Sequence, residues 1–516
     1  MDSLAAIFSY DSAQPLSFLS DYFAVALLVF GFGYVAVRKR VTLRTIYVVL
    51  FSLFLYYKMS GLYLLLLCGV AISDYLIAQR VARRRERGVG ARGWVALSAF
   101  INIAILTYFT ASNFIAHTIN DLYGSGTLDW EPVVKVVGVS FFVFQSLAYV
   151  IDVSRGTIAP LKRFDNYLFL LSFFPKLVCG PLVKAKEFIP QIESAEVFVT
   201  KEDMGRAVTL IATGLFKFML ISQVIGTLFV GPAFAGTLGD GGLVALLAVY
   251  GFTMQLYCDF SGFSDFAVGM ALMMGFRLPD NFDAPYKSAT ITEFWRRWHI
   301  SLSTWLKEYL YISLGGNRKG KVRTYVNLFL TMFLGGLWHG VSLPFMAWGA
   351  LHGIALALHK VWLSVVPGAK SVGCDMRPFW RVLATIFTLH LVAFGWLLFN
   401  SPDMDTVGTM LHNIFHNMSL SEIGSLDILS KVAVGVIILG YILHYIPRSA
   451  NGMLCRTITR SGFVGQWVVV VVTLWTVSEC NELLGDYRKI DAEARVELTG
   501  GAVEATNAGL PAYGAF

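Results

Sequence analysis

The sequence has few charged residues. Only 15% of its 516 residues are Asp, Glu, Lys or Arg, against about 25% in an ordinary soluble domain. So few charges cannot cover the surface of a soluble globule, and a hydrophobic share of 56% excludes a disordered chain. A compact basic domain of the kind that binds nucleic acid is also missing. We therefore expect no nucleic-acid partner, and read the net charge of +7 as a signal of membrane topology.

Three further features are absent. The six cysteines are scattered singly, with no CxxC pair, which argues against a zinc site or a disulfide framework, so no metal is expected. No basic stretch precedes the first apolar run, so we expect no cleavable signal peptide and a first span that is retained. The inverted repeat that many transporters carry is not visible either.

Long apolar segments recur along the whole chain. A membrane-spanning helix needs roughly 20 mostly apolar residues. The candidate segments are 22–37, 44–58, 61–78, 94–116, 133–151, 207–230, 242–258, 263–276, 326–337, 342–365, 379–399, 431–446 and 463–479. Several are short or interrupted by Gly and Pro, so we expect an all-α polytopic membrane protein with about eleven crossings plus re-entrant pieces.

Basic residues follow the first and third segments, at 38–40 and 80–87. Positively charged loops stay on the cytoplasmic side of a membrane. This pattern places the N-terminus outside the cytoplasm, with the loop 113–132 on the same outer side.

The segment 292–314 has the pattern of an amphipathic helix. Thr290 or Thr292 can cap its start, and the glycines at 315–316 can end it. At 100° per residue one face is polar; it holds Arg296, His299, Ser303 and Lys307. Such a helix should lie in the membrane interface or line a cavity. A peripheral helix that only anchors the protein to lipid phosphates explains the periodicity equally well.

A basic loop follows this helix and should be cytoplasmic. Its cations are Arg318, Lys319, Lys321 and Arg323. The spacing of Gly315, Gly320 and Lys321 imitates a P-loop, but Val322 stands where a magnesium-binding Ser or Thr is required, so a nucleotide hydrolase is excluded. A flexible basic loop can still attract a phosphate group.

A histidine lies in an apolar run at 327–340, in the sequence Gly335-Gly336-Leu337-Trp338-His339-Gly340. The glycines allow a neighbouring helix or a substrate to approach closely. A titratable ring at membrane depth is a functional candidate, and a neutral imidazole can take a proton from a hydroxyl nucleophile. A packed histidine bonded to a carbonyl is the alternative. We read His352 and His359 as structural.

Other polar groups also occur in apolar surroundings. Asp259 and Asp265 are carboxylates six residues apart, better suited to pinning helices or lining a cavity than to paired acid catalysis. Gly180 and Pro181 follow an apolar run and predict a broken or re-entrant helix there.

These motifs resemble the membrane-bound O-acyltransferase (MBOAT) superfamily, in its bacterial alginate O-acetylation branch. The resemblance runs through the middle of the chain almost continuously and is rich in Trp, His and Gly. Its stretches are GVSFFVFQSLAYVIDVSRG at 138–156, SFFPKLVCGPLVKAKEF at 172–188, YCDFSGFSDFAVGMALMMGFRLPDNFDAPYKS at 257–288, ITEFWRRWHISLSTWLKEYLYISLGGNRKG at 291–320, NLFLTMFLGGLWHG at 327–340 and WGALHG at 348–353.

The resemblance implies a ring of membrane helices around a central funnel, in the inner membrane. It divides the chain into N-terminal membrane helices (1–130), a catalytic core (131–365), C-terminal membrane helices (366–483) and a polar, loosely ordered tail (484–516). His339 would be the catalytic histidine at the funnel floor. His299 would lie nearer the cytoplasmic opening, where the acyl donor enters.

The resemblance predicts an enzyme that moves an acyl group, expected to be acetyl, from cytosolic acyl-CoA to an extracytoplasmic polysaccharide such as alginate, directly or through a periplasmic or surface acyltransferase partner. Acyl-CoA is a cosubstrate, and no cofactor is expected. The donor side would be formed by Arg296, Lys307, Arg318, Lys319, Lys321, Asp259 and Trp338. D-alanyl transfer to teichoic acid, a transporter, and a scaffold of a polysaccharide secretion complex are the alternatives.

Overall fold

The computed structural model describes residues 8–499, apart from 13–14, 17, 19, 125–129, 131–132, 134–135 and 367–375, and its side chains apart from 21 and 488–499. Within these ranges every regular element is a helix. The helices form two compact units. One holds the residues up to Thr200 together with Met270–Pro279, and the other holds Lys201–Gly269 together with the residues from Asp280 onward.

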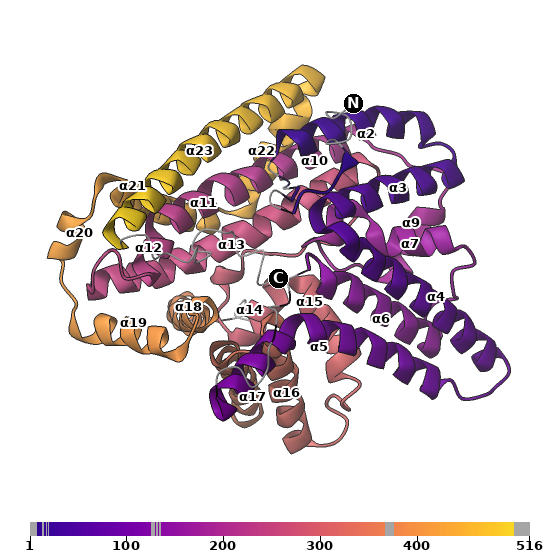
Figure 1. Ribbon diagram of the computed structural model, residues 1–516, viewed down its shortest axis with the longest axis horizontal. Helices are drawn as coiled ribbons and strands as arrows, with labels where there is room; N and C mark the ends of the chain where they lie inside the picture. The colour runs from indigo at the N-terminus through magenta and orange to yellow at the C-terminus, as the bar shows by residue number, and fades with distance from the viewer. Residues whose placement is uncertain are drawn as a thin grey trace. The chain divides into compact units, whose positions relative to one another are not determined.

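The first unit contains the indigo and purple helices of Figure 1. They are α2 (Asp21–Val37), α3 (Val41–Ser60), η1 (Gly61–Tyr63), α4 (Leu64–Glu86), α5 (Arg92–Tyr123), α6 (Val139–Arg155), α7 (Phe164–Ser172), α8 (Phe174–Leu177) and α9 (Ala185–Glu193). The Ser20 hydroxyl caps α2 by accepting a hydrogen bond from the Phe23 amide, and Gly156 ends α6 in the left-handed conformation, as both residue types predict.

Buried polar groups tie the helices of this unit together. The Asp74 carboxylate on α4 accepts hydrogen bonds from Asn102 Nδ2 on α5 (2.7 Å) and from Ser146 Oγ on α6 (2.6 Å). Arg44 on α3 is fully buried and donates to the carbonyls of Ile192 and Ser194, each at 2.8 Å. Such bonds offset the cost of removing charged groups from water.

The chain between α7 and α9 is broken, as its Pro and Gly residues predict. Helix α7 ends at Ser172, the short α8 covers Phe174–Leu177, and no helix is present from there to Ala185. The extended stretch is held by Gln145 on α6, whose amide donates to the Val183 carbonyl (2.8 Å) and accepts from the Val183 amide (3.3 Å). A glutamine in an apolar helix therefore satisfies backbone hydrogen-bonding groups of a non-helical segment.

The second unit carries the remaining helices (Figure 1). They are α10 (Lys201–Leu215), η2 (Phe216–Ile221), α11 (Ser222–Ile225), η3 (Gly226–Val230), α12 (Gly231–Phe234), α13 (Gly242–Met273, whose last residues join the first unit), η4 (Pro285–Lys287), α14 (Ile291–Arg297), α15 (Ile300–Trp305), η5 (Leu306–Tyr311), α16 (Lys321–His339), α17 (Leu343–Val365), α18 (Pro378–Asn400), α19 (Met404–His416), α20 (Ser421–Ser425), α21 (Ile428–Tyr445), α22 (Arg448–Arg460) and α23 (Gly462–Thr499).

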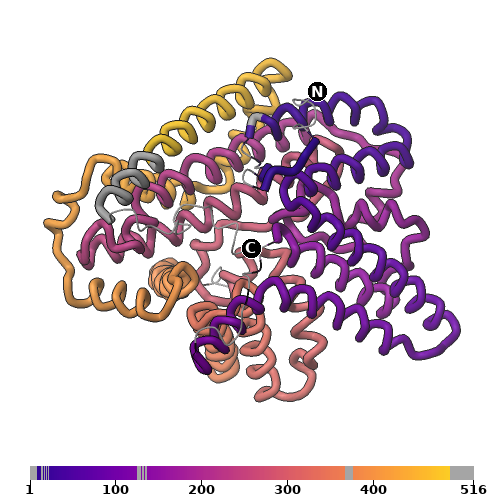
Figure 2. Tube along the Cα trace, viewed as in Figure 1, coloured from indigo at the N-terminus to yellow at the C-terminus, as the bar shows by residue number. Residues whose placement is uncertain are grey.

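Residues 201–234 run alongside α13 in the second unit (Figure 2). They form one helical path with two π-helical stretches, η2 and η3, a geometry that is frequent at functional sites. The backbones approach closely at Gly214 and Gly262: a Cβ on Gly214 would lie 2.7 Å from the Gly262 carbonyl oxygen. The prediction of two spans, 242–258 and 263–276, is wrong, because α13 is continuous.

Seven helical stretches of the described residues are long and apolar enough to cross a membrane; the first, Val41–Glu86, includes both α3 and α4. Helix α2 is apolar but shorter, and neither α16 nor α17 is among the seven. The chain is thus an all-helical, multi-pass membrane protein, whereas about eleven crossings stay a prediction. Helix α23 extends to Thr499, where a loose tail was expected from 484, and residues 500–516 lie outside the described residues. The division at 130, 365 and 483 also stays a prediction.

Candidate active site

His299 lies where a helix breaks. Helix α14 ends at Arg297 and α15 begins at Ile300. Between them His299 adopts φ 40° and ψ 57°, a left-handed conformation that is uncommon for a residue with a side chain and that is often found at functional sites. The predicted single helix over 292–314 is therefore wrong, although Thr290 caps its start as expected, with its hydroxyl accepting from the Glu293 amide.

The break changes which residues share a face. His299 is 2% exposed, whereas Arg296 and Lys307 lie at exposed positions. The polar stripe expected from uninterrupted helical periodicity is therefore not formed. The tight turn at His299 directs its ring into the protein and leaves the two cations at the surface.

Asn281 holds the His299 turn in place. Its backbone carbonyl accepts from the Ile300 amide at 2.9 Å. Its side-chain oxygen lies 3.1 Å from His299 Nδ1 and accepts from the amide (3.1 Å) and hydroxyl (2.9 Å) of Ser301. Its side-chain nitrogen donates to Ser264 Oγ on α13 at 3.2 Å. The asparagine thus joins α13 to His299 and to the start of α15.

The far side of the His299 ring is apolar. The ring of Phe260 on α13 stands edge-on at 4.5 Å and that of Phe282 is stacked at 6.5 Å. His299 Nε2 is buried and has no hydrogen-bond partner among the residues that the structure describes. His299 lies outside the seven span candidates, and burial, with a smaller effect from the charge of His339, lowers its pKa well below the usual 6.5. The ring is therefore neutral at pH 7.

His339 is the last residue of α16. The helix packs closely on α17 through glycines, as expected from the sequence: a Cβ on Gly336 would lie 2.5 Å from the Phe345 carbonyl oxygen, and one on Gly349 would lie 2.8 Å from the Met332 carbonyl oxygen. The half-buried His339 ring is surrounded by aromatic rings. Their centroids lie 4.4 Å (Trp338), 4.9 Å (Phe399), 5.4 Å (Trp348) and 6.3 Å (Phe345) away.

A continuous set of aromatic rings connects the surroundings of the two histidines. Trp348 lies next to His339, and Trp396 is stacked on Trp348 at 5.8 Å. Trp298 lies 4.8 Å from Trp396 and 5.1 Å from Phe282, the ring that stacks on His299. The two imidazoles are therefore set in one apolar, aromatic region, and they interact electrostatically.

His352 and His359 connect α17 to α14. Trp295 Nε1 donates to His352 Nδ1 at 3.3 Å, and the Thr292 hydroxyl lies 2.7 Å from His359 Nδ1. His352 is fully buried. These contacts agree with the structural roles expected for both residues. Among the described residues no three His, Cys, Asp or Glu side chains come together as metal ligands would.

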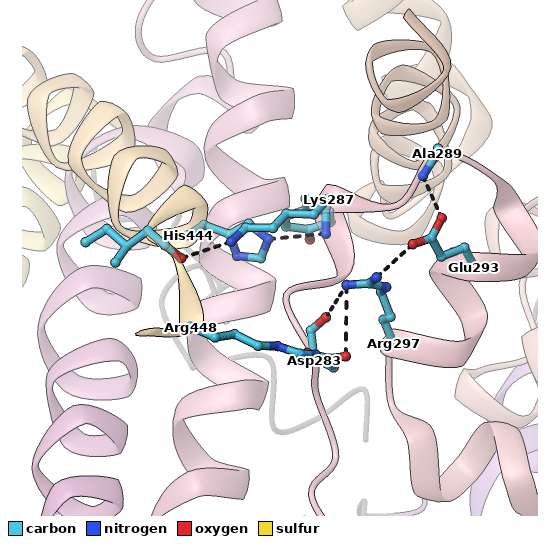
Figure 3. Close-up of polar contacts among 9 residues, drawn as sticks. Asp283, Lys287, Ala289, Glu293, Arg297, His444 and Arg448 are labelled. Carbon is cyan, nitrogen blue, oxygen red and sulfur yellow. Dashed lines mark hydrogen bonds and ion pairs between the residues drawn. The ribbon is translucent and has the colours of Figure 1, made fainter. Parts of the chain in front are cut away.

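An ion-pair network fixes the segment between α13 and α14 (Figure 3). Glu293, 1% exposed, accepts from Arg297 at 2.8 Å and from the Ala289 amide at 3.1 Å. Arg297 also approaches Asp283 at 3.9 Å, and Asp283 pairs with Arg448 at the start of α22. The same segment is tied to α21, because His444 Nε2 accepts from the Tyr286 amide at 3.2 Å. Sequence reasoning missed this network.

The basic loop and Trp338, both predicted for the donor side, lie at opposite ends of α16. Arg318, Lys319 and Lys321 are exposed, and Lys321 begins α16 while His339 ends it. At 1.5 Å per residue, about 27 Å of helix separates these two ends. Trp338, in contrast, contacts His339 directly. The structure therefore brings Trp338 to the histidine but leaves the basic loop at the opposite end of the helix.

Asp259 on α13 is 5% exposed, and one of its carboxyl oxygens is buried with no hydrogen-bond partner in the described ranges. It is one residue from Phe260, which contacts His299. Asp265 has a different role: it pairs with Lys217 of η2 at 2.5 Å and thus holds α13 against the helical path of residues 201–234. Of the two carboxylates singled out from the sequence, Asp259 is the one that keeps an unpaired buried oxygen among the described residues; consecutive residues of a helix point in different directions, so its place next to Phe260 in the chain does not by itself bring it to His299.

Comparison with known proteins agrees with this geometry. A family model described as membrane-bound O-acyltransferase matches residues 102–387. The chain belongs to this family. It is 38% identical over 390 residues to "Probable alginate O-acetylase AlgI" of Pseudomonas syringae, covering 73% of this chain and 71% of the relative. It is 31% identical to the "Peptidoglycan O-acetyltransferase" of Helicobacter pylori (78% and 80%) and 30% identical to the "Teichoic acid D-alanyltransferase" of Streptococcus thermophilus (52% and 69%).

The MBOAT membership shows that the chain is a membrane-embedded acyltransferase. The matched region contains His299, His339, Asn281 and the basic loop. The predicted family and enzyme class are confirmed, whereas the roles of individual residues stay predictions.

Proposed function

We propose that this MBOAT protein transfers an acetyl group from cytosolic acetyl-CoA across the inner membrane, for O-acylation of an extracytoplasmic polysaccharide such as alginate. Transfer to the polymer occurs directly or through a periplasmic or surface acyltransferase. The observation that carries the proposal is the placement of two histidines, His299 and His339, in one aromatic region of a membrane acyltransferase. The names of the acetylase relatives support the choice of acetyl and of a cell-envelope polymer.

His339 acts as the general base in this proposal. Its ring lies at the end of α16 among aromatic groups. It takes the proton of the acceptor hydroxyl as that oxygen attacks the thioester carbonyl, and the proton then passes to the departing thiolate. Such assistance typically contributes 10²–10⁴-fold in rate. A thioester is already an activated acyl donor, so the step needs no cofactor.

His299 and Asp259 form the donor side, with Trp338 as a wall of the pocket. The exposed Arg296 and Lys307 attract the donor, and Arg318, Lys319 and Lys321 do so from the far end of α16. Because about 27 Å of helix lies between Lys321 and His339, the loop meets the phosphate-bearing end of the donor and not its acyl group. We place this loop in the cytoplasm and the N-terminus outside it, following the positive-inside rule.

The test is acetyl transfer by the purified protein in vesicles, with radiolabelled acetyl-CoA and an alginate acceptor. His339→Ala should lower the transfer rate by 10²-fold or more. His412→Ala is a matched control, because His412 is exposed on α19 away from the aromatic region. Wild-type activity of the His339→Ala protein would overturn the role assigned to His339.

D-alanyl transfer is the second candidate, since a D-alanyltransferase relative matches 52% of this chain. The acetylase relatives match 73–78% of it, which favours acetyl. Supplying the vesicles in parallel with acetyl-CoA and with a D-alanyl carrier protein separates the two. Transfer of D-alanine alone would overturn the acetyl proposal. Membership of an acyltransferase family argues against the transporter and scaffold alternatives.

A further inference from the structure

The oxygen of the Asn281 side chain can be identified from its surroundings. One terminal atom of this side chain faces the Ser301 backbone N–H at 3.1 Å, and a backbone N–H can only donate. The atom must therefore be the amide oxygen, and the nitrogen is the atom that faces Ser264. The usual ambiguity between the two ends of an asparagine amide is removed by this backbone contact.

This orientation determines the protonation pattern of His299. An amide oxygen accepts and never donates a hydrogen bond, so the hydrogen bond of 3.1 Å to Asn281 Oδ1 requires a proton on His299 Nδ1. Because burial keeps the ring neutral, Nε2 then carries a lone pair and no proton. Within the described part of the chain this nitrogen is buried without a partner, and leaving such an acceptor unused costs free energy.

We infer that Asn281 is a positioning residue, which holds His299 as the Nδ1–H tautomer so that its Nε2 accepts a hydrogen bond from an O–H, N–H or S–H group of the reacting substrates. This inference rests on the proposed acyl transfer and adds a specific role for a residue outside the catalytic pair. Three observations support it independently of charge. They are the left-handed turn at His299, the convergence of the Ser301 amide, the Ser301 hydroxyl and the His299 ring on one oxygen, and the open Nε2.

Few other groups around the His299 ring can affect its protonation. Phe260 from α13 and Phe282 from the segment before α14 face the ring with carbon atoms. Asn281 from the same segment and Ser301 from α15 supply neutral polar groups. The titratable group whose charge acts on His299 is His339 of α16. A carboxylate in place of Asn281 would therefore have a direct effect on the ring.

Asn281→Asp is the informative substitution. Aspartate keeps the oxygen that accepts from His299 and Ser301, and the Ser264 hydroxyl can donate to its second oxygen. Its negative charge stabilises the imidazolium form and raises the pKa of His299. Protonation converts Nε2 from an acceptor into a donor, so the rate should fall as the pH falls through the His299 pKa. In the wild type this fall lies below pH 6.5, and in Asn281→Asp it should move up by about one unit or more.

The experiment compares the pH profiles of kcat for wild type, Asn281→Asp and Asn281→Ala. We expect Asn281→Ala to lower kcat by about tenfold or more with little change in donor KM, and Asn281→Asp to recover most of this loss at high pH. Asn102→Ala is the control: Asn102 is a fully buried asparagine in the first unit that also bonds a neighbouring helix. It should lower thermal stability without moving the pH profile.

A double mutant separates positioning from packing. If Asn281 acts through His299, Asn281→Ala should cause no further loss of kcat in a His299→Gln background. Additive losses, or an unmoved pH profile in Asn281→Asp, would overturn the inference. Failure of the proposed function itself is distinguishable, because the wild-type protein would then transfer no acetyl group. Nitrogen chemical shifts of ¹⁵N-histidine-labelled protein, with His299→Gln to assign the signal, report the tautomer directly; an Nε2–H tautomer would also refute the inference.

Discussion

The two adjacent glycines of α16 provide a sharp test of how the His339 end of the helix is held. Gly336 faces α17, where an added Cβ would lie 2.5 Å from the Phe345 carbonyl oxygen and 3.0 Å from Gly349 Cα. Gly335 is open: its nearest neighbour would be Leu306 Cδ1 at 3.6 Å. Both residues are in the same helix, so they share the same intrinsic preference for alanine.

The magnitude follows from these distances. Restoring an ordinary contact of 3.4 Å from 2.5 Å requires the two backbones to separate by about 0.9 Å. Overpacking of this kind costs about 1–3 kcal/mol, partly offset by about 1 kcal/mol from replacing glycine in a helix. The larger effect is on the position of His339, three residues further along. A misplacement near 1 Å can lower a rate by about 10²-fold.

We therefore predict that Gly336→Ala lowers kcat of acetyl transfer by about 10²-fold with at most a modest loss of thermal stability. Gly335→Ala should retain wild-type kcat and be equally or more stable. The assay is radiolabelled transfer in vesicles, with thermal unfolding followed in the same preparation. Equal rates for the two variants would refute the idea that the close contact of α16 with α17 sets the position of His339.

Two further predictions concern charges around the site. Arg318→Glu combined with Lys321→Glu should raise the donor KM by about tenfold or less, an effect of on the order of 1 kcal/mol that shrinks at high salt because exposed charges are screened; kinetics at two ionic strengths check it, and an unchanged KM at low salt would remove the loop from the donor site. Glu293→Gln should lower the free energy of unfolding by roughly 3 kcal/mol, because Arg297 then loses the charge of its buried partner. Thermal unfolding measures this change, and wild-type stability would contradict the prediction.

Local sequence signals predicted the features that depend on single residue types. Pro and Gly near Gly180 predicted the broken stretch after α7, and Gly336 predicted a close helix contact. The continuous α13 was missed because Asp259, Ser261 and Gly262 interrupt the apolar run. In the structure Gly262 lies against a close neighbouring backbone, and Ser261 bonds Lys217 at 3.1 Å. Contacts with another helix offset the cost of these polar residues. A hydropathy window that covers one segment cannot detect such contacts.

The environment of His299 could not be predicted in the same way. Helical periodicity assumes an unbroken helix, and a histidine gives no sign that it will adopt a positive φ. The turn is imposed by Asn281, 18 residues earlier in the chain, through the Ile300 amide and the His299 ring. An isolated asparagine carries no signal of such a tertiary role, so the prediction of a polar stripe with Arg296 and Lys307 was wrong for a reason outside the local sequence.

Both candidate histidines lie at ends of helices, and the two ends have different electrostatic consequences. His339 is the last residue of α16, where the helix dipole stabilises a positive charge. His299 is buried, and burial together with the charge of His339 disfavours its protonation. Burial therefore keeps His299 neutral at pH 7. In the proposed mechanism the proton of the acceptor hydroxyl goes to His339, while the neutral His299 keeps the lone pair of Nε2 available to a substrate.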